Sequence, residues 1–316
     1  MPPIPLVRVV RSGLTESIHL GSVAVAAADG RLLASAGDPA RVTFARSSMK
    51  PLQAAVSLRF IDDGLADDEV AVMCGSHNAE PIHLKAVTSL LNRGSLEVGG
   101  LRCPPALPLD RDAAATVRER RPEFHNCSGK HAGMLLASVR AGFPTDTYVE
   151  PEHPLQQAVL RAVTEAAGEE PAAVGVDGCG VPVHALPLHA LATLYARLVS
   201  GATERAEAVV ESMRRAPYLV AGRDRVCTAV MERAEVIVKV GAEGLVCAGL
   251  PGRGIGVAIK IEDGSPRGLD PAIVRALRLL EALPPDGGLE PFARPPVLGG
   301  GRPVGELVSE FELQQA

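Results

Sequence analysis

Short apolar runs separated by turn signals occur near both ends of the chain. Ser22–Ala28 is an apolar run closed by Asp29-Gly30, and the second run Arg31–Ser35 follows it, which predicts a β-hairpin. Near the other end, three β-rich runs with glycine-containing turns between them predict an antiparallel meander. These runs are Glu235–Val240, Leu245–Ala248 and Ile255–Ile261. The pattern further predicts a last amphipathic helix at Asp270–Leu283 and an edge strand at Pro303–Phe311.

The middle of the chain carries apolar residues at helical spacing. Asp67-Asp68-Glu69 places acids in the first turn of a helix that stops at Gly75, and another helix opens at the polar stretch before Leu84. Residues 110–123 alternate acid and base, which is typical of a solvated helix face. Further helices are predicted after residue 131 through Val139, at His153–Gly168, at Leu186–Ser200, and within 203–215 and 223–233.

This order of elements predicts a mixed α/β (α+β) fold. If both groups of strands form one sheet, the helical middle is a lobe inserted between them, and the functional site lies where the two meet. We therefore expect a single catalytic domain, residues 1–316, in two lobes. Residues 1–46 and 234–316 would form a mainly antiparallel sheet flanked by helices, and residues 47–233 a mainly helical lobe.

Composition narrows the class of protein. The 316 residues are 47% hydrophobic, so a large core is available, but there are only six Phe, three Tyr and no Trp. Few aromatic residues and a net charge of -5 argue against a nucleic-acid partner. No apolar run reaches the ~20 residues that span a bilayer, and no signal-peptide pattern opens the chain, so we expect a cytoplasmic protein. Six cysteines without a Cys-x-x-Cys motif favour reduced thiols over disulfides.

Three short motifs indicate serine chemistry. Ser47 and Lys50 form the Ser-x-x-Lys pair, and Pro51, tolerated only in a first turn, predicts that a helix starts beside them. The hydroxyl of Ser47 could be a nucleophile with the neutral amine of Lys50 as its base, or simply an N-cap. Ser76-His77-Asn78 and Lys239-Val240-Gly241 supply the Ser-x-Asn and Lys-x-Gly elements in the order expected of serine amidohydrolases. A turn serine and a solvated strand end are the simpler alternatives.

A fourth cluster contains cysteines. Cys127-Ser128-Gly129-Lys130-His131 places a thiol and an amine one helical turn apart, and Cys179 lies in a glycine-rich stretch. Thiolates favour zinc, but two core cysteines beside a polar loop would give the same pattern. Spacing alone leaves five candidate ligands: Cys127, His125, His131, Cys179 and His184.

Together these motifs resemble the asparaginase II family, the rhizobial type of L-asparaginase. The resemblance rests on Arg46–Lys50, Ser76–Glu80, Cys127–His131, Asp177–Gly180 and Lys239–Gly244, and it spans about residues 8–312. It implies a fold similar to serine β-lactamases and glutaminases, and a homodimer.

The resemblance also implies roles for individual residues. Ser47 would be the nucleophile beside Lys50, and Ser76 and Lys239 a second Ser-Lys pair, with Lys260 the alternative to Lys239. A zinc ion would be held by Cys127, Lys130 and Cys179, with Asp177 next to it at the substrate. The requirement of zinc for turnover is left open.

The implied reaction is the hydrolysis of L-asparagine to L-aspartate and ammonia. Arg46 could bind the α-carboxylate and Asp177 the ammonium, while His131 would orient groups in the substrate site. A glutaminase or another serine amidase on the same fold is the nearest alternative, since a pocket distinguishes one methylene by only ~1–3 kcal/mol. A non-catalytic zinc-binding or amino-acid-binding protein is the alternative of another class. A cell-wall peptidase would need an export signal, which the sequence does not show.

Overall fold

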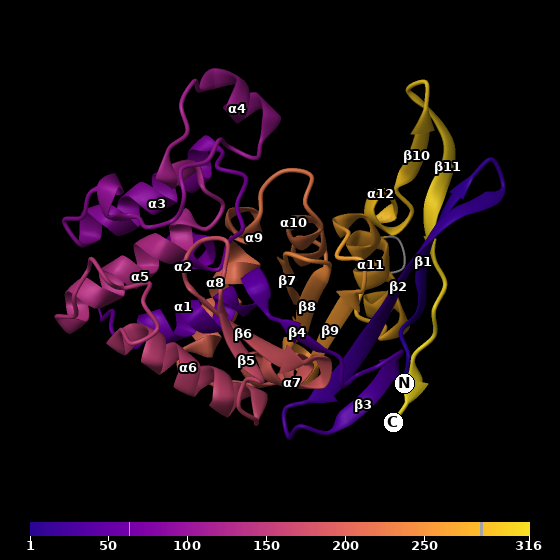
Figure 1. Cartoon of the computed structure of the whole chain (residues 1–316), viewed down its shortest axis with the longest axis horizontal. Helices are drawn as coiled ribbons and strands as arrows, with labels where there is room; N and C mark the ends of the chain where they lie inside the picture. The colour runs from indigo at the N-terminus through magenta and orange to yellow at the C-terminus, as the bar shows by residue number, and fades with distance from the viewer. Residues whose placement is uncertain (63, 285–286) are drawn as a thin grey trace. The chain divides into compact units, whose positions relative to one another are not determined.

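The computed structural model describes residues 1–62, 64–284 and 287–316. The chain divides into two compact units (Figure 1). The sheet unit comprises Met1–Ser48, Leu186–Ser200 and Ala229–Ala316. The helical unit comprises Met49–Ala185 and Gly201–Thr228.

The sheet unit is built on one antiparallel sheet. Seven strands follow the order β10-β11-β1-β2-β9-β8-β7, while β3 pairs with β2, and β12 with β3. The strands are β1 (Ile4–Arg11), β2 (Leu14–Ala27), β3 (Leu32–Ala36), β7 (Ile237–Gly241), β8 (Leu245–Leu250), β9 (Ile255–Ile261), β10 (Pro296–Gly299), β11 (Arg302–Ser309) and β12 (Gln314–Gln315). N- and C-terminal strands meet where β2 pairs with β9, with Val23 opposite Ile259 and both side chains buried. The predicted mixed fold, with an antiparallel sheet assembled from both ends of the chain, is confirmed.

Two helices pack on this sheet, α7 (Leu188–Val199) and α11 (Leu269–Leu279). Gly256 of β9 allows α7 to approach closely, because a Cβ at this position would lie 1.9 Å from the carbonyl oxygen of Ala192. The short elements β4 (Val42–Phe44), η1 (Arg46–Met49) and α12 (Glu290–Ala293) complete the main features of this unit. The prediction that residues 186–200 belong to the helical lobe was wrong, since α7 buries its apolar face against β2, β8 and β9.

The helical unit surrounds α5 (Ser128–Ala141), whose first eleven residues are all buried. Its other helices are α1 (Lys50–Leu58), α2 (Asp67–Met73), α3 (Pro81–Arg93), α4 (Arg111–Thr116), α6 (Pro154–Ala167), α8 (Ala206–Arg215) and α9 (Pro217–Val220). Strand β5 (Ala173–Val176) pairs with β6 (Pro182–Pro187), and α10 (Val226–Met231) ends near the return to the sheet unit. Gly129 lets α5 lie directly against the backbone of α2.

Several predicted boundaries were wrong. Strands β1, β5 and β6 were not predicted. The predicted edge strand at Pro303–Phe311 corresponds to β11, which is not at the edge of the sheet because it pairs with β10 on one side and with β1 on the other. The predicted helix at 110–123 is only the six-residue α4. The helix ends at Thr116, where Val117 is already extended; Pro122 accounts only for the extended conformation of Arg121, the residue before it.

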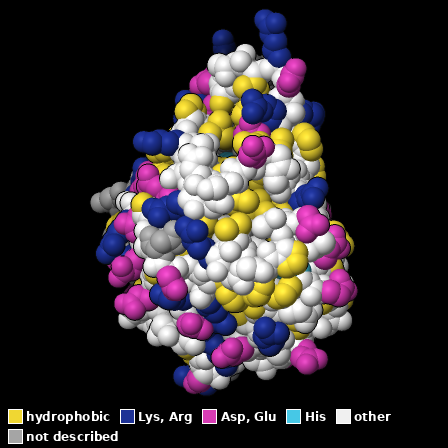
Figure 2. All heavy atoms as spheres, turned by 90° about the vertical axis from the view of Figure 1, so that its left-hand side faces the viewer, with side chains coloured by type: hydrophobic (Ala, Val, Ile, Leu, Met, Phe, Trp, Pro, Cys, Tyr) yellow, Lys and Arg dark blue, Asp and Glu magenta, His cyan; other side chains and the backbone are white. Residues whose placement is uncertain are grey.

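The surface carries both signs of charge. On the face drawn in Figure 2, acidic and basic side chains are interspersed, with hydrophobic patches between them. No helix in the described part of the chain combines the length and hydrophobicity that a bilayer-spanning segment requires.

Candidate functional site

The sheet unit presents Ser47 on a sharp turn. After β4, Arg46 adopts a left-handed backbone with φ 47°, a conformation that costs a residue with a side chain about 1–3 kcal/mol. This turn starts η1 and leaves Ser47 partly exposed. Ser48 points inward instead, where its hydroxyl donates to Ala45 O and its carbonyl accepts from Tyr195 Oη, both at 2.6 Å. The predicted nucleophile is therefore accessible, on a backbone that the surrounding structure holds in strain.

The two alternative lysines of the sheet unit have different surroundings. Lys239 is completely buried on β7, and it shares with Ser48 the neighbourhood of the Cys247 thiol, whose pKa is raised to about 12 by burial. Lys260, on β9, donates to the carbonyls of Glu243 and Ile261, and burial lowers its pKa. Lys239 and Ser48 therefore share Cys247 as a neighbour, whereas Lys260 is bonded to two carbonyls near the turn that follows β9. The pairing of either lysine with Ser76 stays a prediction.

In the helical unit, Lys50 opens α1 with Pro51 in the first turn, as the sequence predicts. Its side chain is only 1% exposed. The Nζ atom donates to Gly75 O, to Ser76 Oγ at 3.0 Å and to Asn126 O at 3.4 Å. Within this unit, therefore, the lysine of the Ser-x-x-Lys motif contacts the serine of the Ser-x-Asn element directly.

Ser76-His77-Asn78 is an extended segment held on both sides. Ser76 N donates to Val220 O, and Asn78 N donates to Ala221 O. His77 Nε2 lies 3.0 Å from Ser128 Oγ, which links the segment to the start of α5. The side chain of Asn78 binds Arg225 and the backbone of residue 223, so it serves to hold the segment in place.

The thiol cluster predicted from the sequence is assembled. Lys130 Nζ lies 2.9 Å from Cys179 Sγ, and the Cys179 and Cys127 thiols are themselves hydrogen-bonded. Both cysteines and the lysine are at most 4% exposed. Asp177 Oδ2 is 3.6 Å from Cys179 Sγ, at the edge of the cluster. The structure thus brings together four residues that the sequence separates by up to about fifty positions.

The interactions within the cluster shift the pKa values of Cys127 and Cys179 in opposite directions. The hydrogen bond from Cys179, assisted by the amines of Lys50 and Lys130, holds the pKa of Cys127 well below its usual value despite burial. The pKa of Cys179 is raised by the Cys127 hydrogen bond and by burial. Burial lowers the pKa of Lys130, but the two thiols outweigh it, so the pKa is raised. One thiolate at Cys127 with a protonated Cys179 is the arrangement that these interactions favour.

Lys50 joins this cluster to the serine segment. It is hydrogen-bonded to Cys127 as well as to Ser76. In the sequence, the Ser-x-x-Lys pair and the two cysteines belong to separate motifs, and the spacing of these motifs does not predict the interaction between Lys50 and Cys127. Tyr148, which the motifs also leave out, is completely buried with its hydroxyl 2.6 Å from His131 Nδ1.

The three histidines that the spacing gave as candidate zinc ligands lie in different surroundings. His125 is near Lys50, Cys179 and Lys130, and burial followed by Lys50 lowers its pKa. Burial lowers the pKa of His131 to about 4, although the interaction with Cys179 opposes this shift. His184 is buried on β6, where burial alone lowers its pKa to about 4. In the described ranges, no three or more His, Cys, Asp or Glu side chains form a metal-binding group.

The set of two cysteines and one lysine is chemically suited to a soft cation. Two thiols and one amine converge in a buried site, and the Cys127 thiolate is favoured before any metal binds. His131 also interacts with the Cys179 thiol. A cation held by Cys127, Lys130 and Cys179 would have to displace the protons of the amine and of the second thiol. The zinc assignment stays a prediction.

Comparison with known proteins gave several results. The family model described as L-asparaginase II matches residues 7–309. No curated protein matches the chain. Solved structures similar to it include Mglu in its native form, 17% identical over 84% of this chain and 62% of the other, with a TM-score of 0.48. The chain therefore spans about three fifths of the Mglu chain.

Two other solved structures are also similar to the chain. A β-lactamase from Mycobacterium bovis is 17% identical over 83% of this chain and 95% of the other, with a TM-score of 0.46. A Bacillus glutaminase is 11% identical over 83% of this chain and 91% of the other, with a TM-score of 0.45. The family model, by contrast, covers nearly the whole chain and includes every motif discussed above. The protein belongs to the L-asparaginase II family.

Proposed function

We propose that the protein is an amidohydrolase that converts L-asparagine and water to L-aspartate and ammonia. Its membership of the L-asparaginase II family supports an amidohydrolase. The observation that carries the proposal is the position of the Lys50 amine, which is buried, bonded to Ser76 Oγ, and only three positions along the chain from the partly exposed Ser47.

In the proposed reaction, Ser47 Oγ attacks the side-chain amide carbon of asparagine while Lys50, in its neutral form, takes the hydroxyl proton. Backbone N–H groups at the start of this helical segment would stabilise the oxyanion. Ser76 and Lys239, the predicted second pair, would pass a proton to the leaving ammonia. Water then hydrolyses the β-aspartyl ester, which releases aspartate and returns the proton to Ser47.

The two charged ends of the substrate need opposite partners. Arg46 remains our candidate for the α-carboxylate, and its ion pair with Glu243, at 4.0 Å, is loose enough to be exchanged. Asp177 is our candidate for the ammonium, with His131 orienting groups at the substrate site. Cys127, Lys130 and Cys179 would hold zinc, which when bound would supply a fixed positive charge beside Asp177.

The test is an assay of ammonia release from L-asparagine and from L-glutamine, with zinc per chain measured on the same sample. Ser47→Ala should reduce turnover by several orders of magnitude. Ser57→Ala, which removes a hydroxyl bonded only locally to Gln53 O on α1, is the matched control and should leave turnover unchanged. Turnover retained in Ser47→Ala would refute the mechanism, and faster turnover of glutamine would change the substrate.

Zinc has its own control. Cys127→Ser should lower the zinc content, whereas Cys74→Ser changes a buried thiol directly after α2 that donates to Val70 O and should leave it unchanged. Equal metal content in the two variants would refute the assignment of the zinc ligands. Tight binding of asparagine without turnover in the wild type would favour the non-catalytic alternative.

A further inference from the structure

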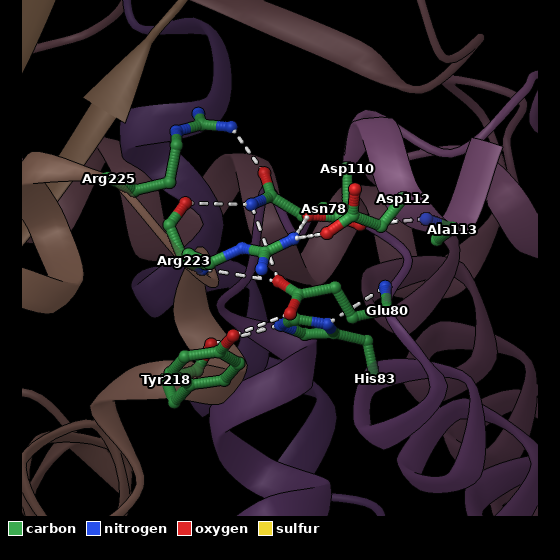
Figure 3. A network of polar contacts seen from close by, with 9 residues as sticks. All are labelled: Asn78, Glu80, His83, Asp110, Asp112, Ala113, Tyr218, Arg223 and Arg225. Atoms are coloured by element: carbon green, nitrogen blue, oxygen red, sulfur yellow. Dashed lines mark hydrogen bonds and ion pairs between the residues drawn. The ribbon is translucent and has the colours of Figure 1, made fainter. Parts of the chain in front are cut away.

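A polar network surrounds Asn78, two residues after Ser76 (Figure 3). At its centre is Arg223, whose Nη2 lies 2.6 Å from Asp110 Oδ2 and 2.7 Å from Asp112 Oδ2. The backbone of the same residue is also engaged: its N–H donates to Glu80 Oε1, and its carbonyl accepts from Asn78 Nδ2. One residue therefore joins the segment that contains Asn78 to the two aspartates.

The two aspartates belong to the α4 segment, which we define as residues 104–121. Only Pro108 and Asp110 of these residues are buried. The segment contacts the serine element through its backbone, since Leu109 N and Asp110 N both donate to Asn78 O at 3.0 Å. Asp110 also caps α4 by accepting from Ala113 N, and this bond, followed by Arg223, lowers its pKa.

Packing contributes little to the position of this segment. A cavity of about 380 Å³ is lined by α4 on one side and α3 on the other. Its apolar walls include Leu84, Ala113 and Val117. Because this space is not filled by side chains, hydrogen bonds and ion pairs must hold the α4 segment against Asn78.

Glu80 also belongs to the network and helps to fix Asn78. Glu80 accepts from Tyr218 Oη and from the backbone N–H of Arg223 (Figure 3), so the carboxylate is shared between two segments. Gly222 fits between them only because it has no side chain: a Cβ there would lie 2.4 Å from Glu80 Oε1, and its φ is 108°. Asn78 is thereby bonded through its N–H, its carbonyl and both side-chain atoms.

We propose that Arg223 is a positioning residue for Ser76. By holding Asp110 and Asp112, its guanidinium keeps Leu109 N and Asp110 N on Asn78 O, and this fixes the Ser76 hydroxyl opposite the Lys50 amine. Because Ser76 is only two residues from Asn78, release of the α4 segment loosens the 3.0 Å contact between Ser76 and Lys50. The proposal rests on the proposed function, since it assigns Arg223 to the same reaction without contact to substrate.

The first measurement is kinetic. Arg223→Ala should lower kcat by about tenfold or more with KM changed less than twofold, because small displacements of a catalytic group cost up to about a hundredfold in rate. Arg223→Lys keeps the charge but loses the planar fork, so its kcat should lie between those of Arg223→Ala and the wild type. Arg111→Ala is the matched control: an exposed arginine on α4, next to both aspartates but outside the drawn network, whose loss should leave both constants unchanged.

The second measurement does not depend on turnover. In Arg223→Ala, amide hydrogen exchange should accelerate at Leu109, Asp110 and Asn78, and trypsin should cut faster after Arg118 or Arg120. Exposed Asp112→Asn removes only one ion-pair partner, so it should show a smaller change of the same kind and carries the test if Arg223→Ala does not fold. Exchange as slow as in the wild type, or accelerated exchange with an unchanged kcat, would overturn the proposal. If the wild type hydrolyses neither amide, the proposed function fails, while the exchange result still decides whether Arg223 holds the segment.

Discussion

Gly129 lies inside the Cys-Ser-Gly-Lys-His motif, and its substitution gives the sharpest test of how the thiol cluster is built. A Cβ on Gly129 would lie 2.2 Å from Val72 O and 2.8 Å from Val72 C, both backbone atoms of α2. Ordinary contact begins at 3.4 Å, so Gly129→Ala must move α5 away from α2 by about 1.2 Å. A carbonyl oxygen fixed in a helix cannot rotate out of the way.

Two effects of opposite sign decide the magnitude. Alanine favours a helix over glycine by about 1 kcal/mol, while overpacking a close-packed core costs about 1–3 kcal/mol or more. Because the clash is with rigid backbone, we expect Gly129→Ala to lower the free energy of unfolding by about 2 kcal/mol. Gly133→Ala is the matched comparison on the same helix: the three atoms nearest to its Cβ would all belong to the side chain of Met73, with Cε at 2.5 Å and Cγ at 2.7 Å. Methionine can change rotamer, so this variant should stay within about 1 kcal/mol of the wild type.

Urea unfolding followed by circular dichroism, with chelator present, measures both variants without a contribution from metal. The same displacement moves Cys127 and Lys130, which flank Gly129, relative to Cys179. Zinc per chain should therefore fall in Gly129→Ala and not in Gly133→Ala. A Gly129→Ala protein as stable as the wild type, or less perturbed than Gly133→Ala, would refute the packing argument.

Two further predictions concern pH and stability. Burial raises the pKa of Glu69, but hydrogen bonds from Arg93 and Ser89, each at 2.7 Å, outweigh it and the pKa is lowered. Its stabilisation is therefore present above pH 4.5 and lost as the pH falls further, and Glu69→Gln should cost about 2 kcal/mol in unfolding experiments at pH 7; an equal loss at pH 3 would contradict this. Burial lowers the pKa of His184 from 6.5 to about 4. Between these two pH values the unfolded chain binds a proton at this residue and the folded chain does not, so the free energy of unfolding decreases by roughly 3 kcal/mol as the pH falls from 6.5 to 4. The stability curve of His184→Gln should be flatter there, and a curve parallel to the wild type would show that His184 is not the group responsible.

Local signals in the sequence were sufficient for much of the fold. Turn residues and alternating apolar positions located the meander β7–β9, and Pro51 located the start of α1, because these features depend on a few neighbouring residues. Gly168 likewise ends α6 in the left-handed conformation that the stop signal predicts. The family resemblance, carried by five short motifs, is confirmed over residues 7–309.

Other features depend on contacts that no local pattern contains. Strand β5 is only four residues long and exposed, so it has no buried face to produce alternation. The residues of α7 would suit a helix in either unit, and only the packing of α7 on the sheet shows that it belongs to the sheet unit. The role of Asn78 was equally hidden, because its partners Arg223 and Arg225 follow it by about 145 residues.

The contact between Lys50 and Cys127 changes how variants of the thiol cluster are interpreted. Cys127 is bonded to Lys50, so its replacement disturbs the amine that faces Ser76, whether or not a metal is bound. Lost turnover in Cys127→Ser therefore does not by itself assign a role to zinc. Lys130 is hydrogen-bonded to Cys179, so Lys130→Met removes a predicted ligand and leaves the bonds of Lys50 to Gly75 and Ser76 in place. If zinc supports the reaction, both variants lose metal and turnover together; if Cys127 acts by holding Lys50, the metal-free Lys130→Met protein keeps its turnover while Cys127→Ser does not.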